Sequence, residues 1–182
     1  AGKPVIFATD VGQHQMWAAQ NLKIEKPRTW LTSGGLGAMG FGLPAAMGAQ
    51  LAVPDKRLVH IAGDGGMKMT GNELYTIANC NLPIISIVID NSGLGMIRQM
   101  QRLFFQQHYS ACNLPLGFDF TAYARSFGIA ATAVQDERQF AGALAAALEA
   151  CRPTVIVAKI DPAEMVRPML APDAALNDFL DF

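Results

Sequence analysis

The stretch HIAGDGGMKMTGNELYTIANCNLPIISIVIDNSGLGM (60–96) places an acidic residue and an amide directly after two apolar runs. Asp64 lies between glycines after RLVHIAG (57–63), and Asn91 follows IISIVID (84–90), 27 positions after Asp64. Continuous apolar runs with β-branched residues are typical of parallel strands that are covered on both faces. Because the carboxyl ends of such strands meet at one edge of a sheet, we expect the carboxylate and the carboxamide to lie close together.

Strand and helix patterns alternate over most of the chain. They predict an α/β fold, a doubly wound and mostly parallel sheet with helices on both faces. The expected strands are 5–9, 57–63, 84–90, 129–134 and 154–160, and the expected helices are 15–21, 40–52, 71–80, 95–107, 120–127 and 137–151. Thr70 and Glu73 have the spacing of a capping box, as do Asp136 and Gln139. We expect one domain at 1–160, followed by a proline-containing C-terminal arm at 161–182.

Composition favours a globular domain and argues against several kinds of partner. The 182 residues are 51% hydrophobic and 16% charged, which suffices for a sizeable core. The net charge is −1 and the Lys and Arg are scattered, so we expect no nucleic-acid partner. We expect no membrane span either, because the longest apolar strand run, PIISIVI (83–89), is far short of the ~20 residues required. The start at Ala1, directly before an expected strand, suggests a part of a longer protein.

The three cysteines, Cys80, Cys112 and Cys151, are spaced neither as a zinc site nor as a disulfide framework. We therefore expect reduced thiols and a cytoplasmic location.

A glycine-rich segment, SGGLGAMGFG (33–42), imitates the dinucleotide-binding fingerprint of dehydrogenases. Gly35, Gly37 and Gly40 have its spacing and precede an expected helix. However, the preceding KPRTWLTS is a poor strand, and Asp64 is held between glycines instead of projecting toward a ribose. We therefore do not favour a nucleotide-binding dehydrogenase.

Asp64 and Asn91 carry the oxygen ligands that Mg²⁺ prefers. This ion takes six oxygens at ~2.0–2.1 Å and usually binds through one or two protein side chains together with phosphates. Gly63, Gly65 and Gly66 leave room for the backbone to close around a phosphate. We therefore predict a metal that carries a phosphorylated cofactor. The alternative is structural: Asp64 would cap the following helix and Asn91 would turn the chain.

Gly-Asp-Gly followed at this distance by Asn resembles the signature of thiamine diphosphate enzymes. Three segments narrow the resemblance: TDVGQHQMWAAQ (9–20), WLTSGGLGAMGFGLPAAMGA (30–49) and DNSGLGMIRQ (90–99). In this order they resemble the catalytic large subunit of acetohydroxyacid synthases, also called acetolactate synthases. The resemblance covers most of 1–170 and implies the C-terminal thiamine diphosphate-binding domain and fold of that family, with thiamine diphosphate and Mg²⁺ as cofactors.

The resemblance also implies a role for individual residues. Mg²⁺ would be bound by the side chains of Asp64 and Asn91 and by the carbonyl of Gly93. The diphosphate would be contacted by Val11, Gly12, Gln13, His14, Gly65 and Gly66. Gly37 and Met39 would hold the aminopyrimidine through backbone groups, and Met39 would act catalytically by wedging between the two rings of a bent cofactor. Leu94, Gly95 and Met96 would lie near the diphosphate and the thiazolium.

Two of these residues also have ordinary interpretations. His14 would then be a surface histidine beside a helix start, and Met39 a core residue at a helix edge. His60 and His108 lie in no motif, and we assign them no role.

In this family the cofactor carries the difficult chemistry. The enzyme decarboxylates pyruvate and condenses the two-carbon unit with a second 2-oxoacid to give 2-acetolactate or 2-aceto-2-hydroxybutyrate, in branched-chain amino acid biosynthesis. An activating Glu comes from the N-terminal pyrimidine-binding domain of a partner subunit, and a middle domain binds FAD. Neither domain is in this chain, so we expect FAD only in the full-length enzyme and no synthase activity from the 182 residues alone. The expected assembly is a homodimer or homotetramer, with a regulatory small subunit as a further candidate partner.

The chain departs from the family pattern at two positions. Met100 stands after GMIRQ, where the family typically has Trp, which puts a preference for 2-oxobutyrate over pyruvate as second substrate in doubt. Asp90 replaces a second Asn before Asn91, so its charge would either lie near the metal or point into the sheet.

Two other functions remain open at this point. Another thiamine diphosphate-dependent enzyme, such as pyruvate oxidase, glyoxylate carboligase or a 2-oxoacid decarboxylase, would keep the cofactor and change the reaction. A non-catalytic interaction module would bind no cofactor at all.

Overall fold

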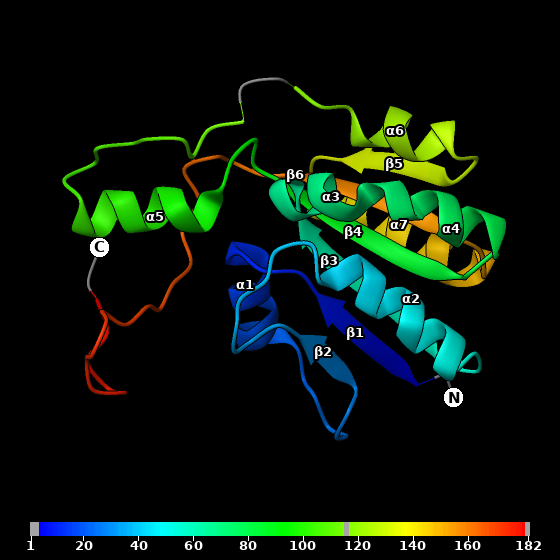
Figure 1. The fold of residues 1–182 in the computed structure, drawn as a ribbon, viewed down its shortest axis with the longest axis horizontal. Coiled ribbons are helices and arrows are strands. Elements are labelled where there is room, and N and C mark those ends of the chain that lie inside the picture. The colour runs from blue at the N-terminus through cyan, green and yellow to red at the C-terminus, as the bar shows by residue number, and fades with distance from the viewer. Residues whose placement is uncertain (1–3, 115–116, 181–182) are drawn as a thin grey trace.

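The computed structural model describes residues 4–114 and 117–180, and its core is a six-stranded parallel sheet. The strands are β1 (Val5–Thr9), β2 (Trp30–Thr32), β3 (Arg57–Gly63), β4 (Ile84–Asp90), β5 (Ala130–Val134) and β6 (Thr154–Lys159). Their order across the sheet is β2-β1-β3-β4-β6-β5, and every neighbouring pair is parallel (Figure 1). The predicted doubly wound α/β fold is therefore confirmed.

Helices cover both faces of this sheet. They are α1 (Gln13–Asn21), α2 (Gly42–Ala52), α3 (Asp64–Thr70), α4 (Leu74–Asn79), α5 (Gly95–Phe104), α6 (Phe120–Ser126) and α7 (Glu137–Ala150), with a 3-10 turn η1 (Gly71–Glu73) before α4. Buried residues of α2, α3, α4 and α6 pack on one face, around Leu58 and Val88. On the other face, Phe140 and Leu144 of α7 pack around Ile85.

Two expectations for the local structure are wrong. The helix expected at 71–80 is preceded by α3, which begins at Asp64, so Thr70 and Glu73 form no capping box. Instead, Glu73 accepts a hydrogen bond from Thr76 Oγ1 at 3.1 Å. The segment KPRTWLTS does contain a strand, β2, which pairs with β1 at the edge of the sheet. By contrast, Asp136 caps α7 as expected and accepts from the N–H of Gln139 at 2.7 Å.

The C-terminal arm, which the structure describes over 161–180, does not run free of the domain. It passes beside α5, which projects from the carboxyl end of the sheet (Figure 1). Met165, Val166 and Met169 of the arm are buried. Within 4–114 and 117–180, none of the helices combines the length and the apolar character that crossing a bilayer requires.

The order of the strands determines where a ligand pocket lies. From β1 the chain moves outward to β2, then returns to the other side of β1 to form β3 and continues to β4. The connections therefore leave β1 and β3 in opposite directions, and a crevice opens at the carboxyl ends of these strands. Asp10, Asp64 and Asn91 directly follow β1, β3 and β4 at this crevice.

Candidate functional site

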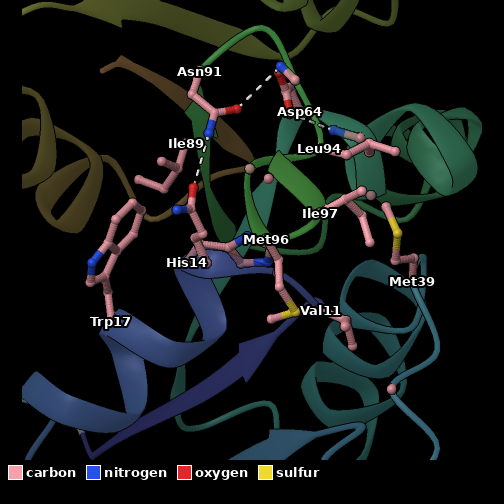
Figure 2. Close-up of a pocket in the computed structure, with 18 residues that line it drawn as sticks. Val11, His14, Trp17, Met39, Asp64, Ile89, Asn91, Leu94, Met96 and Ile97 are labelled. Carbon is pink, nitrogen blue, oxygen red and sulfur yellow. Dashed lines mark hydrogen bonds between the residues drawn. The ribbon is translucent and has the colours of Figure 1, made fainter. Parts of the chain in front are cut away.

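A pocket of about 240 Å³ lies at the carboxyl ends of β1, β3 and β4. Every residue to which the sequence assigned a site role lines it: Val11, Gly12, Gln13, His14, Gly37, Met39, Asp64, Gly65, Gly66, Asn91, Gly93, Leu94, Gly95 and Met96. Figure 2 shows Asp64 and Asn91 at the top of the pocket, with His14 and Trp17 coming from α1 and Met39 from the opposite side. Gly63, which was expected to leave room for a phosphate, lines it too, and three lining residues were not predicted, namely Trp17, Ile89 and Ile97.

The side-chain oxygens of Asp64 and Asn91 converge on one point. The backbone N–H of Gly93 donates to Asp64 Oδ2 at 2.9 Å and to Asn91 Oδ1 at 3.2 Å. The carbonyl of Gly93 accepts from the N–H of Gly95 at 3.0 Å and keeps a second lone pair. One carboxylate, one amide and one carbonyl oxygen are a suitable donor set for Mg²⁺.

The alternative that Asp64 caps a helix and Asn91 turns the chain holds for Asn91 but not for Asp64. Asp64 does not cap α3, because the N-cap is Gly63 and no side chain caps this helix. Asn91 does form a local turn through its bond to the N–H of Gly93. Burial raises the pKa of Asp64 to about 6. The hydrogen bond from the N–H of Gly65 lowers this pKa, whereas the charge of Asp90 raises it further. The Asp64 carboxylate is thus destabilised in the absence of a cation.

The Asp90 carboxylate has partners of its own, so we do not expect it to bind a metal directly. Its carboxylate forms an ion pair with Lys159, its register partner on β6, and accepts from the N–H of Ser92 at 3.0 Å. The negative charge of Asp90 is therefore largely paired within the sheet, although it still affects Asp64.

The glycines around Asp64 leave room where side chains would block the site. A Cβ on Gly65 would lie 2.7 Å from Leu94 Cδ2 and 3.2 Å from Met39 Cε. A Cβ on Gly66 would lie 2.7 Å from the Asp10 carboxylate. Backbone can therefore approach a bound group closely at both positions.

His14 is buried and has an unused polar atom. Its Nε2 has no hydrogen-bond partner among the described residues. Burial lowers the pKa of His14 to about 4, against the opposing effect of Asp10, so the free imidazole is neutral at pH 7. An anion in the pocket would give Nε2 a partner and would favour the protonated form. The interpretation of His14 as a surface residue is wrong.

Met39 lies on a loop that a second buried carboxylate holds in place. Asp10 accepts from the N–H of Gly40 at 2.9 and 3.0 Å and from the N–H of Gly42 at 3.2 Å. Gly37, with φ +65°, lets this loop turn beside the pocket. Met39 is half-buried and contributes to neither core cluster. Asp10 was missed from the sequence, although it follows an expected strand directly, as Asp64 does.

The side chain of Gln13 is engaged within the protein. Its Nε2 donates to Gln99 Oε1 at 2.8 Å and to the carbonyl of Glu164 at 3.0 Å, and its Oε1 accepts from Asn91 Nδ2 at 3.2 Å. Gln13 therefore reaches the pocket mainly with the backbone at the start of α1, where N–H groups lack partners within the helix. Gln99 ends the family-like segment DNSGLGMIRQ (90–99), but the sequence assigned it no role.

The pocket provides few positive charges of its own. None of the described residues that line it is Lys or Arg. No group of three His, Cys, Asp or Glu residues suited to a metal occurs among the described residues. A diphosphate bound here would therefore depend on a cation held by Asp64, Asn91 and Gly93 for most of its charge neutralisation.

Met100 lies outside this pocket, in a neighbouring apolar hollow on α5. The hollow is lined by Ile97, Met100, Gln101, Phe104, Phe105, Gln106 and His108. Ile97 lines both spaces and thus connects them.

Comparisons with known proteins place the chain in a cofactor-binding family. Residues 10–158 match the family described as thiamine pyrophosphate enzyme, C-terminal TPP binding domain. The chain is 47% identical over 168 residues to the acetolactate synthase large subunit of Parasynechococcus marenigrum (strain WH8102), covering 92% of this chain and 27% of the relative. It is 43% identical over 176 residues to the acetolactate synthase isozyme 2 large subunit of Escherichia coli (strain K12), covering 97% and 32%. The chain thus spans less than a third of the length of these relatives.

A solved structure has the same fold. The thiamine diphosphate-dependent 4-hydroxybenzoylformate decarboxylase of Rhodococcus jostii RHA1 superposes with a TM-score of 0.78 at 27% identity, over 88% of this chain and 30% of that one. The resemblance to acetolactate synthase large subunits inferred from the motifs is therefore confirmed by the relatives, and the dehydrogenase interpretation receives no support. The chain belongs to the family of C-terminal TPP-binding domains of thiamine pyrophosphate enzymes.

Proposed function

We propose that the chain is the thiamine diphosphate- and Mg²⁺-binding domain, residues 1–160 with the C-terminal arm 161–182, of an acetolactate synthase. The parent enzyme would decarboxylate pyruvate and condense the two-carbon unit with a second 2-oxoacid to 2-acetolactate or 2-aceto-2-hydroxybutyrate. Identities of 47% and 43% to acetolactate synthase large subunits support this choice within the family.

The observation that carries the cofactor assignment is the convergence of Asp64 and Asn91 oxygens on the N–H of Gly93, in a pocket whose described lining residues include neither Lys nor Arg. Asp64, Asn91 and the Gly93 carbonyl would hold Mg²⁺. Gly65, Gly66, His14 and the start of α1 would surround the diphosphate. When bound, thiamine diphosphate supplies the electron sink for decarboxylation and carbon–carbon bond formation.

The chain's own residues orient the cofactor and exclude water. Met39 and Leu94 approach each other above Gly65, so they can flank the rings of a bound cofactor from one side. Trp17 and Ile89 add apolar surface to the same pocket. The fixed loop that carries Met39 would preserve this arrangement during turnover, because Asp10 anchors it through backbone N–H groups.

The remaining expectations for the parent enzyme belong to the same proposal. It would carry an N-terminal pyrimidine-binding domain that supplies the activating Glu and a middle domain that binds FAD. It would be a cytoplasmic homodimer or homotetramer, with a regulatory small subunit as a further partner. The relatives' greater length is compatible with these additional domains.

Calorimetry with thiamine diphosphate, with and without Mg²⁺, tests the cofactor assignment. We expect binding that requires the metal. If thiamine diphosphate does not bind, or binds equally well without Mg²⁺, the result would contradict the cofactor assignment and favour a non-catalytic interaction module.

Product analysis on the full-length enzyme tests the reaction. Pyruvate should yield 2-acetolactate, whereas release of an aldehyde as the main product would favour a decarboxylase. The likeness to a decarboxylase structure at 27% identity is the observation that keeps this second candidate. The 182 residues alone should form no acetolactate.

A further inference from the structure

A series of three buried carboxamides joins the C-terminal arm to Asn91. Gln99 of α5 pairs with the backbone of Val166: its Oε1 accepts from the Val166 N–H at 2.9 Å, and its Nε2 donates to the Val166 carbonyl at 3.0 Å. Gln13 then donates to Gln99 Oε1 at 2.8 Å and to the carbonyl of Glu164 at 3.0 Å. Finally, Asn91 Nδ2 donates to Gln13 Oε1 at 3.2 Å. We call Asn91, Gln13 and Gln99 the carboxamide relay.

The direction of every bond in the relay is fixed by backbone groups. A peptide N–H can only donate and a peptide carbonyl can only accept. The peptide groups of Val166 therefore fix the orientation of Gln99, and the Glu164 carbonyl together with Gln99 Oε1 fixes that of Gln13. Gln13 must then present Oε1 to Asn91, whose Nδ2 turns toward it.

This orientation directs Asn91 Oδ1 toward Asp64. Oδ1 faces the same N–H of Gly93 as Asp64 Oδ2 does. A reversed Asn91 amide would point its NH₂ at the cation position and at the Gly93 N–H, while two oxygens would face each other at Gln13. The relay therefore selects the orientation in which Asn91 offers an oxygen to a metal.

Water cannot easily replace a missing partner in the relay. Asn91, Gln13 and Gln99 are each at most 6% exposed, and Val166 of the arm is fully buried. A buried amide that loses its partner remains unsatisfied, which makes the relay behave as a unit. The arm is also attached outside the relay, since Gln20 Nε2 donates to the Pro168 carbonyl at 3.0 Å.

We propose that Gln99 and the arm backbone at Glu164 and Val166 are positioning groups for the metal ligand Asn91, so that docking of the arm and binding of Mg²⁺ strengthen each other. This inference rests on the proposed function, because it takes Asn91 as a ligand. Outer groups that orient a metal ligand typically contribute 10–100-fold to metal affinity. The coupling is reciprocal, so Mg²⁺ must stabilise the docked arm by the factor by which the arm increases Mg²⁺ affinity.

The first test compares Gln99→Leu with Gln101→Leu in the full-length protein. Gln101 lies on the same helix and makes the same kind of pair with the backbone of Ser110, at 2.9 and 3.2 Å. This pair is exposed, and no side-chain hydrogen bond joins it to the relay within the described part of the chain. Calorimetric titration of Mg²⁺ in the presence of thiamine diphosphate should show affinity lowered about tenfold or more in Gln99→Leu. Gln101→Leu should bind Mg²⁺ as the unaltered protein does. Equal affinities in the two variants would overturn the inference.

The second test needs no variant and therefore does not depend on the folding of Gln99→Leu. The Val166 N–H donates to Gln99 Oε1, and its hydrogen exchange is measured with and without Mg²⁺ and thiamine diphosphate. We expect slower exchange when both are bound. Exchange at Val166 that ignores them would contradict the coupling.

The outcomes also separate this inference from the proposed function. Failure of the unaltered protein to bind thiamine diphosphate with Mg²⁺ would remove both. Metal-dependent binding that is equally strong in Gln99→Leu would remove only the role of the relay.

Discussion

Asp64 and Asn91 share one hydrogen-bond donor, the backbone N–H of Gly93, which lies 2.9 Å from Asp64 Oδ2 and 3.2 Å from Asn91 Oδ1. The two side chains follow adjacent parallel strands, β3 and β4, so the register of the sheet brings them together. The other oxygen of Asp64, Oδ1, accepts from the N–H of Gly65 at 2.7 Å, and these two N–H groups satisfy only part of the acceptor capacity of a carboxylate and an amide oxygen. The arrangement is thus better suited to a cation than to a purely structural turn.

Asp64→Asn should abolish metal-dependent binding of thiamine diphosphate and stabilise the free protein. Burial raises the pKa of Asp64 to about 6 from an ordinary value of 3.8. For an acid, such a shift favours the fold at pH below about 4, and this contribution is lost as pH rises through about 6. At pH 7 the neutral Asn removes this destabilised charge, but its NH₂ leaves the N–H of Gly65 or of Gly93 without an acceptor, which offsets part of the gain. We therefore expect the free energy of unfolding to rise by only about 1 kcal/mol in urea denaturation.

Asp10→Asn is the matched control for that substitution. Asp10 is also buried, but its carboxylate accepts from the N–H groups of Val11, Gly40 and Gly42. Replacing one oxygen by an NH₂ should leave one of these donors unsatisfied and destabilise the protein by about 1–3 kcal/mol. Equal stability changes in the two variants would mean that the Asp64 carboxylate is not destabilised in the free protein.

Gly65→Ala and Gly66→Ala should have different consequences although the residues are adjacent. At Gly66 the new methyl group would meet the Asp10 carboxylate, which backbone N–H groups hold in place, so we expect a loss of roughly 1–3 kcal/mol in unfolding free energy. At Gly65 it would meet the ends of the flexible Leu94 and Met39 side chains. Gly65→Ala should therefore weaken cofactor binding in calorimetry while changing stability by less than about 1 kcal/mol. Cofactor binding that is unchanged in Gly65→Ala would argue against Met39 and Leu94 as neighbours of the cofactor.

The sheet and most of the pocket could be predicted because they depend on local patterns. Apolar β-branched runs such as IISIVID identify buried parallel strands, and polar residues after such runs must lie at one edge of the sheet. β2 was missed because it has only three residues and lies at the edge of the sheet, where pairing with β1 stabilises it rather than its own composition. The start of α3 was missed because three of its first residues, Asp64, Gly65 and Gly66, are poor helix formers.

The carboxamide relay could not be read from the sequence for a different reason. Gln13, Gln99 and Val166 are far apart in the chain, and only the tertiary fold brings them together. A lone glutamine on an amphipathic helix carries no signal that its side chain is buried. Asp10, by contrast, occupies the same position after its strand as Asp64, so a stricter use of the strand-end rule would have identified it.

Met100→Trp in the full-length enzyme should increase the share of 2-aceto-2-hydroxybutyrate formed from a mixture of pyruvate and 2-oxobutyrate. Met100 lies in the apolar hollow beside the pocket, connected to it through Ile97, where a larger ring would add contact area for a longer substrate. Discrimination of one methylene is worth about 10–200-fold at most. Tyr75→Trp, which enlarges an exposed ring on α4 away from the hollow, should leave the product ratio unchanged. An unchanged product ratio in Met100→Trp would mean that this hollow does not contact the second substrate.

His60 should make the stability of the protein depend on pH. It lies in the central strand β3, is fully buried, and has one polar contact, Nδ1 to Ser86 Oγ at 3.3 Å, while Nε2 has no partner among the described residues. Burial, with a smaller effect of His14, lowers the pKa of His60 to about 3. Between about pH 3 and 6.5 the unfolded chain therefore binds a proton at His60 that the folded chain excludes. The contribution of neutral His60 to the free energy of unfolding is therefore fully present above pH 6.5 and is lost as the pH falls. The slope from one such proton approaches roughly 1.4 kcal/mol per pH unit.

His60→Gln removes this titration and isolates its effect. Urea denaturation at pH 7 and pH 5 should show a smaller difference in unfolding free energy for His60→Gln than for the unaltered chain, whatever the variant loses at pH 7 through altered packing. The remaining difference should combine a loss from His14, whose pKa burial lowers to about 4, with an opposing gain from Asp64, whose pKa burial raises to about 6. His108→Gln, at an exposed position outside the sheet, should leave the difference unchanged. An undiminished slope in His60→Gln would mean that the imidazole gains a proton inside the fold, which the apolar surroundings of β3 should prevent because a buried charge without a partner is strongly disfavoured.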